Sequence, residues 1–120
     1  MQLNRLLKSF KFAFKGFYTV FRSEQNFRIQ LLIALAIIIS GFIFELKVWE
    51  WIIIILLILF VLVLEMLNTV FERLVDMLKP RVHLYAHDIK NITSSVVLIT
   101  AFSALIIGLL IFLPRIIALF

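Results

Sequence analysis

Five polar residues that could do acid–base or metal chemistry follow a long apolar run near the middle of the chain. The run, WIIIILLILFVLVL, spans residues 51–64. The polar residues after it are spaced by three or four: Glu65, Asn68, Thr69, Glu72 and Asp76. At about 100° per residue, these side chains share roughly a quarter to a third of one helix surface. Acids within a membrane by default face a protein interior and mark a functional site, so this stripe predicts one.

A structural explanation accounts for only part of the stripe. Asp76, and to a lesser degree Glu72, fit a surface helix whose acids pair with Arg73 or Lys79. Glu65 does not fit, because it directly follows fourteen apolar residues. We therefore expect Glu65 and Glu72 to have functional roles, and the role of Asp76 stays open between the two explanations.

The residue types favour phosphate chemistry with Mg²⁺. This ion takes hard oxygen ligands, often one or two carboxylates together with substrate phosphates. Glu24 is a further candidate ligand, and Lys90 could meet a phosphate as a point charge. A partly desolvated Glu65 would be the better general base toward an alcohol. These parts fit phosphoryl transfer to a lipid alcohol.

Several other kinds of site are excluded or disfavoured. The three glycines, Gly16, Gly41 and Gly108, are too scattered for a glycine-rich phosphate loop. The chain has no Cys, so it has no thiol nucleophile. His83 and His87 are four residues apart, but without a local set of acids a solvated or phosphate-contacting loop is favoured over a zinc site.

The elements that must position these residues are membrane helices. Of the 120 residues, 64% are hydrophobic, against roughly 45–50% in soluble domains. Apolar segments cover residues 29–44, 48–67 and 92–113, and backbone in lipid must be helical. We expect a single all-α membrane domain over residues 1–120. Its transmembrane helices are predicted at 28–46, 48–79 with a cytoplasmic extension, and 88–113.

The segment before the first span predicts a helix of another kind, over residues 4–22. Its apolar residues recur at helical spacing, with lysines and arginines between them. A basic amphipathic helix of this kind lies in the headgroup plane of a membrane. The net charge of +5 is thus explained by the membrane, and no motif for nucleic-acid binding is present.

The distribution of Lys and Arg predicts the topology. Six precede the first apolar segment and four lie between the second and third segments, whereas Lys47 alone lies between the first two and Arg115 alone follows the third. The positive-inside rule places the N-terminus and the second loop in the cytoplasm. The C-terminus and the turn ELKVWE are predicted to lie outside, on the opposite side of the membrane.

The motifs in these segments are similar to one known family. EMLNTVFERLVD resembles the E-x-L-N-[ST]-x-(x)-E-x-x-V-D signature of the small prokaryotic diacylglycerol kinases and undecaprenol kinases. RSEQNFRIQL and FKGF resemble other family segments. GFIFELKVWEWIIIILL and IGLLIFLPR resemble the undecaprenol kinase branch.

The resemblance implies a homotrimer that transfers the γ-phosphate of ATP to a lipid hydroxyl, with Mg²⁺, at sites between subunits. It implies Glu65 as general base and lipid contact, Glu24 and Glu72 as metal and ATP ligands, and Asn68, Thr69 and Asp76 as supporting residues. The implied ATP contacts also include Arg5, Phe12, His83, Lys90 and Asn91. Ser94 matches a position near the lipid.

Two positions depart from the family pattern, and they keep alternatives open. Asn91 stands where the family usually has Asp, and Phe12 stands where some members have Tyr. The acceptor is undecaprenol or diacylglycerol, and the branch-like segments favour undecaprenol. A non-catalytic membrane scaffold is the alternative from another class. A proton relay in a transporter is disfavoured, because the acids cluster at one end of a span.

Overall fold

The fold is entirely helical in the part of the chain that the structure describes. The computed structural model describes residues 2–79, 81 and 83–120, without the side chain of His83. Its four helices are α1 (Gln2–Ser23), α2 (Gln25–Ile43), α3 (Val48–Leu78) and α4 (His83–Ala118). The expected all-α class is confirmed.

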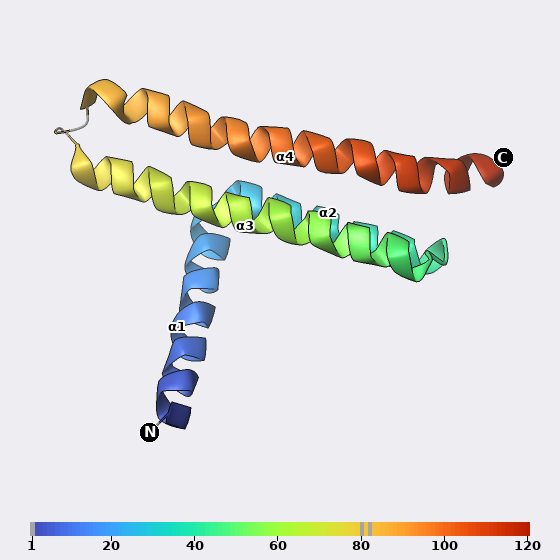
Figure 1. Ribbon diagram of the computed structural model, residues 1–120, viewed down its shortest axis with the longest axis horizontal. Coiled ribbons are helices and arrows are strands. Elements are labelled where there is room, and N and C mark those ends of the chain that lie inside the picture. The colour runs from blue at the N-terminus through green and yellow to red at the C-terminus, as the bar shows by residue number, and fades with distance from the viewer. Residues whose placement is uncertain (1, 80, 82) are drawn as a thin grey trace.

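Helices α2, α3 and α4 lie side by side, and α1 projects from them at a steep angle (Figure 1). α3 contacts both neighbours and packs most extensively against α4. Each of these three helices is long and apolar enough to cross a membrane, which confirms the three predicted spans.

The surface of this bundle is apolar. Large hydrophobic side chains are exposed along the length of α2, α3 and α4, whereas few are buried, among them the small cluster Leu46, Ile54 and Ile111. In water this distribution would be costly, but in hydrocarbon the outward apolar side chains meet a matching solvent. The protein is therefore built to lie in a membrane.

A sharp turn at Glu24 sets the angle between α1 and α2. Glu24 has an extended backbone and directly precedes the first turn of α2. Arg28 donates to the carbonyl oxygens of Phe21 and Arg22, at 2.8 Å and 2.7 Å, which caps the end of α1. Phe27, which is fully buried, packs edge-to-face on Phe17. These contacts hold Glu24 at the junction of the two helices.

The turn between α2 and α3 is tight. Glu45 occupies the left-handed region with a φ of 53°, and the amide of Leu46 donates to the carbonyl of Gly41. Gly41 has no side chain, so the ring of Trp51 can lie against the backbone there; an added Cβ would come within 2.6 Å of that ring. α2 and α3 therefore meet closely at this end.

The connection between α3 and α4 is shorter than the sequence predicts. α3 ends at Leu78, and Lys79 is extended, as expected for a residue before proline. α4 begins at His83, so the predicted loop that holds His87 is helical instead. α4 also continues through Pro114 to Ala118, and it is thus longer at both ends than the predicted span 88–113.

Candidate active site

Glu65 is buried at the end of the apolar run of α3. Its side chain is 3% exposed, and Thr69, one turn later, is equally buried. The Thr69 hydroxyl donates to the backbone carbonyl of Glu65 at 3.1 Å, so it leaves the Glu65 carboxylate free for other contacts. The structure thus places a carboxylate inside the bundle, where the stripe predicts it.

Gln30 of α2 reaches across to this carboxylate. Its Nε2 donates to Oε2 of Glu65 at 3.4 Å, which joins residues 35 positions apart. The oxygen of the same amide, Oε1 of Gln30, is buried and has no hydrogen-bond partner in the described part of the chain. A buried acceptor of this kind is costly unless water, a ligand or another chain supplies a donor.

Asn68 and Glu72 continue the site along α3. Nδ2 of Asn68 donates to Oε1 of Glu72 at 3.1 Å, and Oδ1 of Asn68 is a second buried acceptor left without a partner in the described residues. The Asn68 amide therefore orients the Glu72 carboxylate and presents an additional oxygen beside it. Oxygen ligands of these types are those that Mg²⁺ prefers.

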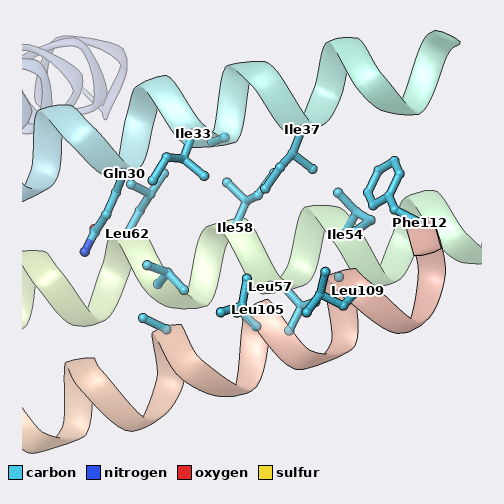
Figure 2. A pocket seen from close by; sticks show the side chains of 15 residues that line it. Gln30, Ile33, Ile37, Ile54, Leu57, Ile58, Leu62, Leu105, Leu109 and Phe112 are labelled. Atoms are coloured by element: carbon cyan, nitrogen blue, oxygen red, sulfur yellow. The ribbon is translucent and has the colours of Figure 1, made fainter. Parts of the chain in front are cut away.

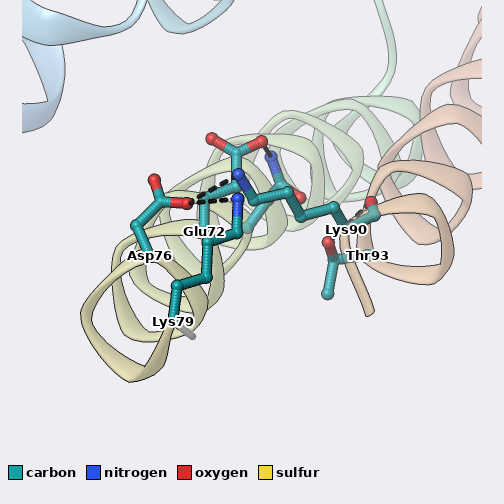
Figure 3. A network of polar contacts seen from close by, with 6 residues as sticks. Glu72, Asp76, Lys79, Lys90 and Thr93 are labelled. Atoms are coloured by element: carbon teal, nitrogen blue, oxygen red, sulfur yellow. Dashed lines mark hydrogen bonds and ion pairs between the residues drawn. The ribbon is translucent and has the colours of Figure 1, made fainter. Parts of the chain in front are cut away.

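Further along α3, the stripe ends in exposed ion pairs. Nζ of Lys90 lies 2.7 Å from Oδ1 of Asp76, and Nζ of Lys79 lies 3.7 Å from the same atom (Figure 3). The Thr93 hydroxyl donates to the Lys90 carbonyl at 3.0 Å. The pair between Asp76 and Lys90 brings the first turns of α4 to the same side of α3 as Glu72.

The three glutamates of the predicted site lie near one another in a single chain. Glu24 and Glu72 are both close enough to Glu65 for their charges to act on it. Among the described residues, no group of three or more His, Asp or Glu side chains is arranged to hold a metal by itself. Since Mg²⁺ commonly uses one or two carboxylates with substrate phosphates, Glu24 and Glu72 still suit it.

Several of the other predicted residues have exposed side chains in the single chain. Arg5 and Phe12 are exposed on α1, and Arg5 lies near the free end that projects away from the bundle (Figure 1). Asn91 and Ser94 are exposed on α4. The side chain of His83 lies outside the described residues.

Two polar residues of this bundle were given no role from the sequence. Gln30 interrupts an apolar segment, and it was missed because its contact depends on how α2 and α3 align. Glu50 is 3% exposed and forms a bidentate ion pair with Arg115, at the far end of α3 from Glu65. The sequence signal for this ion pair was an acid near the start of the second apolar segment and a basic residue just after the third.

Comparison with known protein families shows to which family this chain belongs. The model of the family "Prokaryotic diacylglycerol kinase" matches residues 11–112, which include α2, α3 and the part of α4 that carries Lys90. The chain belongs to this prokaryotic diacylglycerol kinase family. Its members are lipid kinases, for which ATP is the co-substrate.

Two known proteins are similar to this chain over almost its whole length. An undecaprenol kinase of Bacillus subtilis is 42% identical over 114 residues, covering 95% of this chain and 93% of the relative. A diacylglycerol kinase of a Synechocystis species is 31% identical over 115 residues, covering 95% of this chain and 66% of the relative. The family resemblance of the sequence motifs is confirmed.

Proposed function

We propose that this chain is an undecaprenol kinase, which transfers the γ-phosphate of ATP to the hydroxyl of undecaprenol. The main support is the 42% identity with the undecaprenol kinase of Bacillus subtilis over nearly the full length of both chains. The buried Glu65 adds a chemical argument, since it lies where an apolar helix face gives way to polar residues.

In this proposal, Glu65 is the general base. Its carboxylate takes the proton from the lipid hydroxyl as the oxygen attacks the γ-phosphorus, and ADP leaves with the electrons of the broken P–O bond. Gln30 holds the carboxylate through its amide, which fixes the direction from which the hydroxyl approaches. Phosphoryl transfer depends chiefly on such positioning and on electrostatic stabilisation.

Glu24 and Glu72 would hold Mg²⁺, with Asn68 orienting Glu72. The ion would neutralise charge on the phosphates of ATP. Lys90 and Asn91 would contact the nucleotide, together with Arg5, Phe12 and His83, and Asp76 would fix the position of Lys90. Ser94 would lie beside the lipid.

The assembly we propose is a homotrimer in a bacterial cytoplasmic membrane, with each site shared between chains. The support is that Arg5 and Phe12 lie on α1, which projects from the bundle of the same chain (Figure 1). The N-terminus would be cytoplasmic and the C-terminus external, as the distribution of Lys and Arg favours.

The test is a product assay with competing lipids. Purified protein is reconstituted in vesicles that hold equal amounts of undecaprenol and diacylglycerol, and labelled phosphate from Mg-ATP is followed into each lipid. We expect undecaprenyl phosphate as the main product. Phosphatidic acid as the main product would instead support the diacylglycerol kinase that the Synechocystis relative favours, and transfer to neither lipid would contradict both.

A further inference from the structure

One hydrogen bond joins the end of α1 to the part of α3 that carries Glu72. Nη2 of Arg73 donates to Oγ of Ser23 at 3.3 Å, and the two residues are 50 positions apart in the chain. Ser23 is the last residue of α1 and directly precedes Glu24. Arg73 directly follows Glu72 on α3. The bond therefore connects the sequence neighbours of the two candidate metal ligands.

Arg73 does not neutralise the acids of its own helix. The sequence allows it to pair with Asp76, but in the structure that carboxylate is bound by Lys79 and Lys90. Among the described residues, no carboxylate lies at ion-pair distance from the Arg73 guanidinium. Its one side-chain hydrogen bond in this part of the chain is the bond to Ser23, so Arg73 bridges two helices instead of screening one.

Glu24 has a fixed backbone and a side chain that is not used for capping. It is the N-cap residue of α2, but its side chain makes no capping hydrogen bond. Its amide donates to the Val20 carbonyl at 2.9 Å, and its own carbonyl accepts from the Arg28 amide at 3.3 Å. A carboxylate on a backbone held from both sides suits a metal ligand, because binding sites depend on ligands that are already in position.

The other side-chain contacts at this junction join α1 only to α2. Arg28 of α2 caps the last turn of α1, and Phe27 packs edge-to-face on Phe17. These contacts set the angle between α1 and α2, but they leave the distance to α3 open. In the described part of the chain, the bond from Arg73 is the one side-chain hydrogen bond that joins α1 to α3.

Apolar packing between α2 and α3 is interrupted beside the site. A cavity of about 360 Å³ lies between α2, α3 and α4, with Gln30 at one end and Phe112 at the other (Figure 2). Space between helices forfeits the close contacts that hold one helix against another. At the Gln30 end, the amide bond to Glu65 at 3.4 Å joins α2 to α3. Polar contacts therefore have a large share in aligning these helices near the site.

We propose that Arg73 is a positioning residue, which sets the separation of Glu24 and Glu72 through Ser23. This inference rests on the proposed function, in which both glutamates hold the divalent cation that accompanies ATP. The bond limits how far Glu24 can move from α3, and a site that is already ordered loses less entropy when it binds its ligand. Loss of the bond should therefore weaken cation binding and leave the base at Glu65 unchanged.

The test measures metal affinity apart from turnover. Arg73→Met removes the donor and Ser23→Ala removes the acceptor, and both positions are exposed, so each variant is expected to fold. Mn²⁺, which shares the oxygen ligands of Mg²⁺, is titrated into protein that holds a non-hydrolysable ATP analogue, and the free ion is measured by EPR. We expect the apparent Kd to rise about threefold to tenfold, below the roughly 10–100-fold for groups bonded directly to a metal ligand. The kcat at saturating Mg²⁺ should change by less than about twofold.

The combined and conservative variants show whether a single contact is responsible. The double variant should bind Mn²⁺ within about twofold of the weaker single variant, because residues in contact are not additive. Ser23→Thr keeps the hydroxyl and should restore the wild-type Kd. The matched control is Arg22→Met, which removes the same charge from an exposed position in the last turn of α1 and leaves the bond intact. It should also keep the wild-type Kd.

Three outcomes would overturn the positioning role of Arg73. The first is a wild-type Mn²⁺ affinity in either single variant, and the second is a loss in the double variant that equals the sum of the two. The third is a weaker affinity for metal-free nucleotide in Arg73→Met alone, because Arg73 would then contact the phosphates directly. Glu72→Gln identifies a failure of the proposed function: if it keeps the wild-type Mn²⁺ affinity, the metal assignment is wrong and this inference is wrong with it.

Discussion

At the scale of single residues, the site depends on how its carboxylates differ in environment. Glu65 is 3% exposed and contacts an amide, whereas the side chain of Asp76 is 57% exposed and pairs with two lysines. Glu72 lies between them and is held by Asn68. One helix therefore carries a buried candidate base, a candidate metal ligand and a solvated ion pair within twelve residues.

Glu72→Gln should weaken the response to Mg²⁺. Gln keeps an acceptor for Nδ2 of Asn68, so the change removes charge and leaves the hydrogen bond intact. We expect the Mg²⁺ concentration for half-maximal activity to rise about tenfold or more. Even the loss of a residue that only hydrogen-bonds to a metal ligand commonly weakens metal affinity by about that factor. Glu45→Gln, in the exposed turn between α2 and α3, is the control. An unchanged Mg²⁺ titration would remove Glu72 from the metal site.

At the scale of the helices, a buried ion pair fixes the start of α3. Glu50, at the start of α3, is buried and forms a bidentate ion pair with Arg115 of α4. Arg115 also donates to the Ile111 carbonyl at 3.2 Å, close to Pro114, which supplies no backbone donor. The pair thus joins α3 to α4 at the end far from Glu65.

Breaking this pair should loosen the bundle. Glu50→Gln and Arg115→Gln should each lower the free energy of unfolding by about 2 kcal/mol, less than the roughly 3–5 kcal/mol for fully buried pairs because Arg115 is partly exposed. Unfolding in mixed detergent gives these values, and the double variant should cost clearly less than the sum. Strictly additive losses would show that the two residues are not coupled.

Two glycines give a matched test of helix packing. Gly41→Ala should lower the melting temperature, because the added Cβ would come within 2.6 Å of the Trp51 ring and such overpacking costs about 1–3 kcal/mol. Gly108→Ala faces open space and gains helix propensity, so its melting temperature should stay level or rise. Thermal unfolding in the same detergent compares them, and equal destabilisation of both would contradict the packing at Gly41.

The helices were largely predictable from sequence, whereas the contacts between them were not. Run lengths gave the three spans, and spacing on one helix face gave the progression from Glu65 to Asp76. The contacts of Gln30 with Glu65 and of Glu50 with Arg115 depend on the alignment of separate helices, which no local pattern encodes. The helical residues from His83 to His87 were predicted as loop because their polarity resembles a connection. The roles of the site residues remain predictions.

At the scale of the whole molecule, an apolar bundle carries polar chemistry near one end and an ion pair near the other. The distribution of Lys and Arg predicts that the end with Glu65 faces the cytoplasm, where ATP is available. The projecting α1, with its basic and apolar faces, is suited to the membrane surface on that side. The predicted orientation therefore agrees with the proposed chemistry, which needs ATP at the end that carries Glu65.

Cysteine labelling tests this orientation, because the chain itself has no Cys. Ser9→Cys on α1 and Leu119→Cys near the C-terminus are each treated with a maleimide that does not cross membranes. In intact cells we expect labelling at position 119 only, and at position 9 after lysis. The cysteine-free wild type is the control, and labelling at position 9 in intact cells would contradict the orientation.

Glu65→Gln tests the central claim, that a buried carboxylate at the end of an apolar helix activates a lipid alcohol toward ATP. Transfer of labelled phosphate to undecaprenol is measured in vesicles, with nucleotide binding measured on the same samples. We predict that transfer falls by at least about a hundredfold while nucleotide affinity changes by less than about threefold. A variant that keeps wild-type transfer would contradict the claim directly.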